Sequence, residues 1–167
     1  MYIGCTRFTN QTWQENLDYR AKYNEPLIYG SSVRIRDSYN KGSLIFVAEM
    51  NNTTNKIEGI GLIRNSIIPD IHNIYRNYEY NRYIYKGNYW LSREQLLSFD
   101  EDIVEILGII LFKGKSNLKR FLGITILTKK LFTNWAFDLD ELTNKIKTAF
   151  LQHFSKENNF DLLVDNI

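Results

Sequence analysis

The sequence predicts a single α+β domain in which a mixed β-sheet is flanked by helices. Runs rich in Ile, Tyr and Val alternate along the chain with segments that carry helix-capping patterns. The 167 residues include 44% hydrophobic and 24% charged residues, which is the range of one globular domain that can bury its own core. No repeat, linker or low-complexity block divides the sequence, so we treat residues 1–167 as one domain.

The first predicted element is a short strand over residues 2–5. After it, Thr12-Trp13-Gln14-Glu15 has the form of a capping box, in which a Thr hydroxyl and a Glu carboxylate satisfy backbone N–H groups at a helix start. We therefore predict a helix from this run to about Lys22, ended by Pro26 because proline cannot continue a helix. Residues 27–29 then predict a short strand that leads into a Gly-Ser-Ser turn.

The clearest local structure is a β-hairpin of residues 43–50 and 56–64, two runs of sheet-forming residues joined by a polar turn. The second run contains Gly59 and Gly61, and glycines inside a strand usually mark a bulge or the close approach of another part of the protein. Before the hairpin, residues 33–36 alternate apolar and basic side chains and predict a further strand.

The second half of the chain predicts an irregular insertion over residues 67–80 and a strand over residues 82–85. Ser92 is expected to cap a helix, with the Gln95 carboxamide at the third position. Residues 103–112 are apolar enough for a buried strand or a helix, and their periodicity does not decide between them. Residues 124–127 predict a strand.

The most regular pattern predicts a C-terminal helix over residues 138–154. Asp138 precedes apolar residues spaced at three and four positions, as in an amphipathic helix packed on a sheet. From Ser155 onward we expect a helix end and a loosely held terminus.

Composition sets limits on function and setting. The 21 Lys and Arg residues against 19 Asp and Glu residues leave a net charge of +2, so affinity for a polyanion must come from a local cluster of charge. Cys5 is the single cysteine, which excludes an intrachain disulfide and a cysteine-rich zinc site. Because we find no secretory signal and no apolar run of membrane-spanning length, we expect an intracellular, cytoplasmic protein that does not enter the membrane. The abundance of Asn, Ile, Tyr and Lys is typical of AT-rich genomes such as those of large DNA viruses, for which the host-cell cytoplasm or the virion would be the location.

We find no motif that indicates catalysis. His72 and His153 have no second His, Cys or carboxylate at metal-ligand spacing, and the glycine patterns of nucleotide-binding loops and nucleophile elbows are missing. We therefore expect no metal, no cofactor and no enzymatic activity. Asp37, Glu49 and Glu58 leave a small metal-dependent hydrolase or nuclease open, because paired carboxylates need no fixed spacing.

The strongest functional signal is a basic stretch, residues 113–130, that contains no Asp or Glu. Lys129 and Lys130 at its end are expected to solvate a strand terminus, whereas its first part suits a phosphate backbone. Two glycines there would let backbone N–H groups approach an anion. The predicted phosphate ligands are Lys113, Lys115, Ser116, Asn117, Lys119 and Arg120. A solvated loop between two core strands is the alternative interpretation.

Aromatic side chains beside cations supply a second signal. Tyr83 and Trp90 belong to a segment rich in Lys and Arg, and aromatic faces beside cations are what base stacking requires. Trp13 and Tyr29 would add to this surface if the first helix lies nearby. Packing in the core is the alternative for each of these rings.

The order of these elements resembles the PUA-like superfamily, and most its EVE, YTH and ASCH branches. The residues that carry this resemblance are the strands Ile57-Glu58-Gly59-Ile60-Gly61-Leu62-Ile63, Tyr83-Ile84-Tyr85 and Leu122-Gly123-Ile124-Thr125-Ile126. The resemblance covers about residues 1–135 and implies a small, barrel-like β-sheet with flanking helices, to which the C-terminal helix is an addition. It also implies that RNA or a modified base binds in an aromatic-lined pocket.

We therefore expect a nonenzymatic nucleic-acid-binding module, with RNA favoured over DNA, in which the basic loop holds phosphates and aromatic rings stack a base. The alternative from another class is a viral accessory or structural protein that contacts protein partners through its tyrosines. The metal-dependent hydrolase or nuclease is the third hypothesis.

Overall fold

The computed structural model describes residues 1–155, and this part of the chain confirms the predicted α+β class. It contains seven strands, four α-helices and two short 3₁₀ helices. In chain order these are β1 (Tyr2–Phe8), α1 (Asn10–Tyr23), β2 (Leu27–Ser31), β3 (Leu44–Asn51), β4 (Lys56–Arg64), η1 (Tyr78–Asn81), β5 (Tyr83–Gly87), β6 (Tyr89–Ser92), α2 (Arg93–Phe99), α3 (Glu101–Phe112), β7 (Thr125–Ile126), η2 (Lys129–Phe132) and α4 (Leu139–Phe154). None of the helices in the described part has the length and apolarity needed to cross a membrane.

The centre of the fold is a five-stranded sheet with the strand order β6-β4-β3-β1-β7. β1 and β3 run parallel and the other neighbouring pairs are antiparallel, so the sheet is mixed as predicted. Residues of the central strand β3 alternate between two hydrophobic cores, with Phe46 and Ala48 in one and Ile45 and Val47 in the other. Both faces of the sheet are therefore buried.

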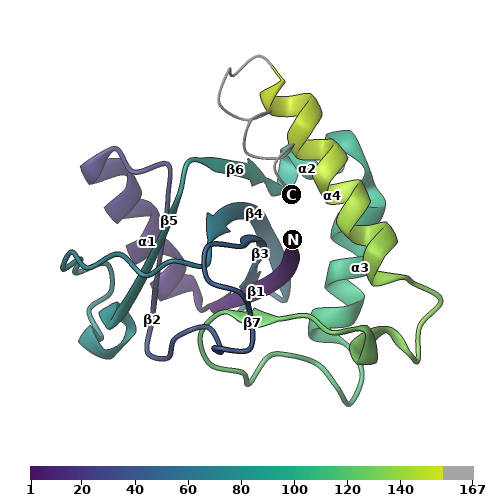
Figure 1. Ribbon diagram of the computed structural model, residues 1–167, viewed down its shortest axis with the longest axis horizontal. Coiled ribbons are helices and arrows are strands. Elements are labelled where there is room, and N and C mark those ends of the chain that lie inside the picture. Colours follow the sequence, from purple (N-terminus) through teal and green to yellow (C-terminus); the bar gives the residue numbers. More distant parts are fainter. Residues whose placement is uncertain (156–167) are drawn as a thin grey trace.

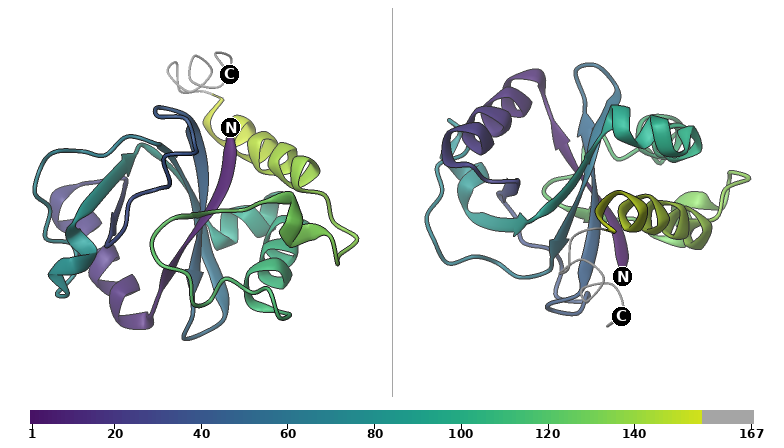
Figure 2. Two further views of the ribbon diagram at one scale, coloured as in Figure 1. Left: turned by 60° about the horizontal axis from the view of Figure 1, so that its bottom comes forward. Right: turned by 90° about the horizontal axis from the view of Figure 1, so that it is seen from above.

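Figures 1 and 2 show that the elements form three layers. One face of the main sheet is covered by α2, α3 and α4, and the opposite face by α1 together with a small sheet of β2 and β5. Ile146 and Phe150 of α4 are fully buried against the sheet, and Asp138 caps the helix, which confirms the predicted amphipathic helix. The N-terminal half thus builds one outer layer and the C-terminal half the other.

The strands β5 and β6 belong to different sheets although they follow each other in the chain. β5 pairs with β2, and β6 joins the edge of the main sheet beside β4. At Gly87 the backbone of β5 passes so close to β4 that a Cβ atom there would collide with the Leu62 carbonyl oxygen. Within residues 1–155 neither sheet closes on itself, so these strands do not form the closed barrel that the resemblance implies.

Helix α1 begins one turn earlier than the capping pattern predicts. Its N-cap is Thr9, and the capping box is formed with Thr12 at the third helical position rather than by Thr12 and Glu15. The Thr9 hydroxyl accepts from the Thr12 N–H at 3.2 Å, and the Thr12 hydroxyl accepts from the Thr9 N–H at 2.9 Å. Thr9 and Thr12 thus satisfy the same kind of backbone N–H groups that Thr12 and Glu15 were predicted to satisfy. Because the cap lies one turn earlier, the helix is longer than predicted. The helix ends at Asn24, whose φ of 52° is left-handed.

The hairpin of β3 and β4 and the Ser92 cap of α2 are confirmed. The register of the hairpin shifts between Glu49 and Met50, opposite Gly59, so the expected bulge is present. Residues 103–112, which the pattern left undecided, are helical and belong to α3.

Two strand predictions need correction. Residues 33–36 form no strand, because the Ile35 N–H donates to the Tyr85 hydroxyl at 3.0 Å and only the Ile35 side chain of this run is buried. β7 is limited to Thr125–Ile126 instead of residues 124–127, since it pairs with β1 over two positions only. The expectation for the terminus after Ser155 lies outside the described residues.

Candidate functional site

The predicted basic loop, residues 113–120, follows α3 directly, but its side chains do not gather at one point. Lys113, Lys115 and Ser116 are exposed. Asn117 instead fixes the loop, because its amide donates to the Gly114 carbonyl at 2.8 Å and its oxygen accepts from a backbone N–H. Asn117 is therefore already bonded and is a weaker candidate for a phosphate ligand than the sequence suggests.

Lys119 and Arg120 point to different surfaces. The Lys119 ammonium donates to Asn55 Oδ1 at 2.7 Å, and its side chain lines a groove beside α3 that also contains the acidic side chains Glu101 and Glu105. Arg120 is exposed and lines a separate groove. Lys113 lines the groove beside α3 together with Lys119, so the loop contributes two cations to that groove and one to the groove of Arg120 instead of forming one binding surface.

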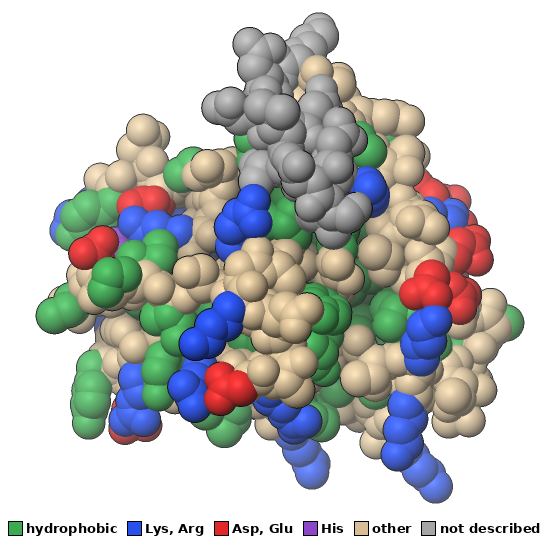
Figure 3. All heavy atoms as spheres, in the orientation of Figure 1, with side chains coloured by type: hydrophobic (Ala, Val, Ile, Leu, Met, Phe, Trp, Pro, Cys, Tyr) green, Lys and Arg blue, Asp and Glu red, His purple; other side chains and the backbone are tan. Residues whose placement is uncertain are grey.

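The groove lined by Arg120 has a volume of about 890 Å³ and also contains Arg34, Arg36 and Lys130. We call it the basic groove, and none of its lining side chains is acidic. Arg34 pairs with the exposed Asp37 at 3.0 Å outside the lining, so its charge is partly compensated. Figure 3 shows Lys and Arg side chains along the lower edge of the molecule, which in Figure 1 is the region around β7.

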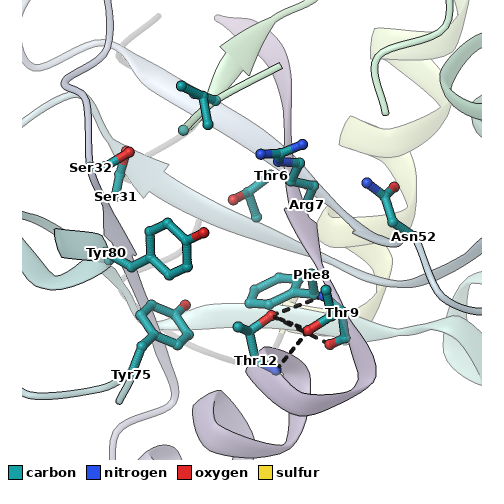
Figure 4. A pocket seen from close by; sticks show the side chains of 13 residues that line it. Thr6, Arg7, Phe8, Thr9, Thr12, Ser31, Ser32, Asn52, Tyr75 and Tyr80 are labelled. Carbon is teal, nitrogen blue, oxygen red and sulfur yellow. Dashed lines mark hydrogen bonds between the residues drawn. The ribbon is translucent and has the colours of Figure 1, made fainter. Parts of the chain in front are cut away.

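A smaller cavity of about 210 Å³ adjoins the basic groove, and Leu122 belongs to the lining of both. The cavity lies between the end of β1, the start of α1, the end of β2 and the segment before β5 (Figure 4). Its lining consists of Thr6, Arg7, Phe8, Thr9, Thr12, Gly30, Ser31, Ser32, Asn52, Tyr75, Tyr80, Leu122 and Gly123. This lining is rich in hydroxyl groups and has no carboxylate.

Among residues 1–155, Arg7 supplies the only charged side chain in the lining of the cavity. Its guanidinium donates to the Lys119 carbonyl oxygen at 2.9 Å, and the Asn52 amide donates to the same oxygen at 2.8 Å. This shared acceptor ties the basic loop to the wall of the cavity. Within residues 1–155 Arg7 takes part in no ion pair, so its charge has no direct partner there.

Two hydroxyl groups point into the same space as Arg7. Figure 4 shows the hydroxyls of Thr6 and Tyr80 directed towards the centre of the cavity. Thr6 is only 7% exposed, and no hydrogen-bond partner for its side chain exists among the described residues. Two other hydroxyls of the lining are already bonded, because Tyr75 accepts from Asn16 at 3.0 Å and Ser31 donates to a backbone carbonyl.

Three of the four predicted stacking residues surround a cation of the protein itself. The Arg20 guanidinium carbon lies 5.7 Å from the ring centroid of Trp13 and 5.6 Å from those of Tyr29 and Trp90. Such distances are typical of cation–π contacts. We call these residues, together with Glu49, the Arg20 cluster.

Glu49 is the centre of this cluster and is 0% exposed. Its carboxylate accepts from Arg20 at 2.7 Å, from the Tyr29 hydroxyl at 2.8 Å and from the Trp90 indole N–H at 2.7 Å. Burial and the neighbouring Glu49 raise the pKa of the Tyr29 hydroxyl well above its ordinary value. Burial alone would lower the pKa of Arg20, but the carboxylate outweighs it and the pKa is raised.

This arrangement changes the interpretation of the aromatic residues. Tyr29 is fully buried, so a base cannot stack on its ring in this structure. Trp13 and Trp90 are partly buried against the hydrophobic core between the main sheet and the small sheet of β2 and β5. Tyr83 lies apart from the cluster, opposite Ser31 at the start of β5. The four rings do not form one stacking surface.

The carboxylates considered for catalysis are also separated. Asp37 pairs with Arg34 on the surface, Glu49 belongs to the Arg20 cluster, and Glu58 accepts from the Asn51 amide at 2.8 Å. No group of three or more His, Cys, Asp or Glu side chains that could hold a metal ion occurs in residues 1–155.

Sequence reasoning missed the residues that line the cavity. Thr6 and Arg7 stand at the end of a predicted strand, and Tyr80 lies in the insertion, so no spacing rule connects them. Arg34 and Arg36 belong to the alternating run of the sequence, and in the structure both side chains line the basic groove. An available signal was that Arg7 follows a buried strand without a nearby acidic residue.

The chain matches no family model, no curated protein and no solved structure. Its function is therefore inferred from the cavity, the basic groove and their charges.

Proposed function

We propose that the protein is a nonenzymatic nucleic-acid-binding module that takes a single strand, with RNA favoured over DNA. The observation that carries this proposal is that the cavity and the basic groove share Leu122 in their linings, and that no acidic side chain of residues 1–155 lines either of them. Phosphates of the strand lie along the groove, and one nucleotide enters the cavity. A base can enter only when it is unpaired, which favours single strands. The hydroxyl-rich lining of the cavity suits the additional 2′-hydroxyl of RNA.

Electrostatics supplies most of the affinity in this proposal. Arg34, Arg36, Arg120 and Lys130 can each neutralise a phosphate, and each contact releases counterions. For a single strand the slope of log K against log salt is about −0.7 per neutralised phosphate, so four contacts give about −3. The small net charge of +2 explains why such binding must be confined to this groove.

Aromatic contacts come from other residues than the sequence suggests. Phe121 is 47% exposed and lines the basic groove together with Tyr39. Bases that follow the strand can stack on such a face, which is tolerant of sequence. Tyr80 provides an aromatic wall inside the cavity. The rings in the basic groove and in the cavity can be reached by a bound strand, whereas the buried ring of Tyr29 cannot.

The PUA-like resemblance and the cytoplasmic location belong to the same proposal. The small sheet of β2 and β5 packs over one face of the mixed sheet, and the close approach of β5 to β4 at Gly87 is what supports the resemblance. The free thiol of Cys5 is buried and suits a reducing compartment.

The proposal is tested by fluorescence anisotropy with labelled single-stranded RNA, single-stranded DNA and duplex RNA at low and high salt. The double variant Arg36→Glu with Arg120→Glu should weaken RNA binding at least about tenfold, because two attractive contacts become repulsive. A matched control reverses the charge of Lys22 and Lys147, which line neither the cavity nor the basic groove. The control should change affinity less than about threefold.

Two results would contradict the proposal. One is the absence of binding to any nucleic acid at low salt by the folded protein. The other is equal loss of affinity in the groove variant and the control, which would indicate nonspecific attraction. Unchanged RNA binding in the groove variant would place the interface elsewhere and would support the protein-interaction hypothesis for this surface.

A further inference from the structure

We infer that the cavity binds a phosphate monoester, presented either by the end of a nucleic-acid strand or by a free nucleotide. The part that concerns a strand rests on the proposed function, whereas the phosphate site itself does not. The inference starts from three groups that converge in one space, namely the Arg7 guanidinium and the hydroxyls of Thr6 and Tyr80 (Figure 4).

Arg7 makes the site selective for an anion. A guanidinium has five N–H donors and no acceptor, and the described residues bind Arg7 through one contact, to the Lys119 carbonyl oxygen at 2.9 Å. That acceptor is neutral, and the described part of the chain places no carboxylate in the lining of the cavity. An oxyanion would supply both the missing acceptors and the missing negative charge, and the planar guanidinium fork matches two phosphate oxygens.

Thr6 shows that the site is built for a polar ligand. The Thr6 residue as a whole is only 7% exposed, and a hydroxyl in such a place ordinarily has a hydrogen-bond partner, either in the protein or in what fills the cavity. Thr6 has none among residues 1–155 and points into the cavity, as does the Tyr80 hydroxyl. Both hydroxyls can donate to the oxygens that Arg7 leaves unbound. A phosphate accepts from all three groups at once.

Size and charge favour a monoester over a phosphate inside a continuous chain. A monoester carries a charge of about −1.5 to −2 at neutral pH, which is more than a diester offers to a single arginine. The cavity volume of about 210 Å³ leaves room for one attached ring or sugar but little for a strand that enters and leaves again. Because Leu122 lines both spaces, the rest of a strand that leaves the cavity beside this residue would reach the basic groove.

The Arg7 contact to Lys119 also positions the basic loop, and the test must separate this role from ligand binding. Asn55 holds the same loop at another point, because its Oδ1 accepts from the Lys119 ammonium at 2.7 Å, and it lines neither the cavity nor the basic groove. The variant Asn55→Gly removes this contact, suits the φ of 53° at this position and leaves the lining of the cavity intact. It is the matched control for Arg7→Gln.

The experiment compares short single-stranded RNAs that carry a phosphate at the 5′ end, at the 3′ end or at neither end, by anisotropy with the wild-type protein. Isothermal titration with AMP and with adenosine covers the free nucleotide. We expect one terminal phosphate to raise affinity at least about tenfold, as charge-assisted hydrogen bonds do. Arg7→Gln, and separately Thr6→Val with Tyr80→Phe, should abolish this preference, whereas Asn55→Gly should retain it.

Each outcome decides between the two proposals. Equal binding of all three RNAs, with AMP no better than adenosine, overturns the phosphate site and leaves the nucleic-acid proposal standing. Binding of AMP without binding of any RNA supports the phosphate site and overturns the nucleic-acid proposal. If Arg7→Gln fails to fold, as judged by its thermal transition, the Thr6 and Tyr80 variant carries the test. A preference that persists in both folded variants would refute the assignment.

Discussion

Two arginines near the start of the chain have opposite surroundings. Arg20 is 8% exposed, pairs with Glu49 at 2.7 Å and is enclosed by three aromatic rings. Arg7 is half-buried in the wall of the cavity, contacts a carbonyl oxygen and has no carboxylate partner in the described part of the chain. The two cations differ mainly in whether the protein itself neutralises them.

This difference separates a structural charge from a candidate binding charge. A buried ion pair needs further hydrogen bonds, and Tyr29 and Trp90 supply them to the Glu49 carboxylate, whereas Arg20 Nε has no hydrogen-bond partner in the described part of the chain. Its aromatic cage is occupied by a cation of the protein, so it has no capacity for a ligand in this structure. The Arg7 side chain keeps unused N–H donors in a space that is open to solvent. A cation without a counter-charge in the protein therefore marks a candidate binding site better than a group of aromatic rings does.

The largest expected effect is the loss of Glu49. Glu49→Ala leaves a buried, uncompensated guanidinium and two buried donors, so the free energy of unfolding should fall by about 3–5 kcal/mol. Urea denaturation followed by circular dichroism measures this change. The double variant Arg20→Met with Glu49→Leu removes both charges and should recover most of the lost stability. A loss below about 1 kcal/mol in Glu49→Ala would show that the cluster does not stabilise the fold.

The second prediction concerns alkaline pH. Burial raises the pKa of Tyr29 and Tyr75 above the ordinary value of 10. Because the folded state then holds protons that the unfolded state releases, stability is complete below pH 10 and falls above it, by roughly 1.4 kcal/mol per tyrosine for each pH unit until the folded pKa is reached.

Thermal melting between pH 8 and pH 12 checks this slope, and absorbance of tyrosinate shows which rings ionise only on unfolding. Tyr29→Phe should reduce the decrease of stability with pH by the contribution of one tyrosine. Tyr78→Phe, at an exposed position, should not change this decrease. Early titration of all tyrosines without unfolding would contradict the buried cluster.

The fold was more predictable than the site because local patterns dominate it. The hairpin, the Ser92 cap and α4 follow from turn residues, capping and periodicity that a few neighbouring positions determine. The start of α1 shows where local patterns fail, since both Thr9 and Thr12 fit the capping rule and the helix begins after Thr9. Residues 33–36 alternate like a strand, but the Ile35 N–H donates to the Tyr85 hydroxyl and not to a neighbouring strand.

The candidate site depends on tertiary contacts that leave no local signature. Arg7 and Tyr80 meet only because β1 ends beside the segment that precedes β5. The basic loop was recognised from its composition, yet its cations are shared between two grooves. Trp13, Tyr29 and Trp90 surround Arg20, which no spacing rule connects to them.

A third prediction examines how tightly the Arg20 cluster is packed. A Cβ atom at Gly59 would lie 2.6 Å from the Leu91 carbonyl oxygen, 2.7 Å from the Trp90 indole nitrogen and 3.0 Å from a Glu49 oxygen. Gly59→Ala should therefore cost about 1–3 kcal/mol of stability through overpacking. Gly108→Ala is the matched control, because its Cβ meets nothing within 4 Å in α3 and should stabilise by about 0.5–1 kcal/mol. Equal effects of the two alanines in urea denaturation would contradict the close packing.

The smallest expected effect on stability is that of Arg7. Arg7→Gln removes an uncompensated charge and one hydrogen bond to the Lys119 carbonyl, which Asn52 still satisfies, so stability should change by less than about 1 kcal/mol. The same variant should lose the stabilisation by a bound ligand, which for the wild-type protein amounts to about 2.7 kcal/mol at a ligand concentration of 100 Kd. Melting curves with and without AMP measure both quantities in one experiment. A large loss of stability in the ligand-free variant would make Arg7 a second structural arginine like Arg20, and the contrast between the two regions would no longer hold.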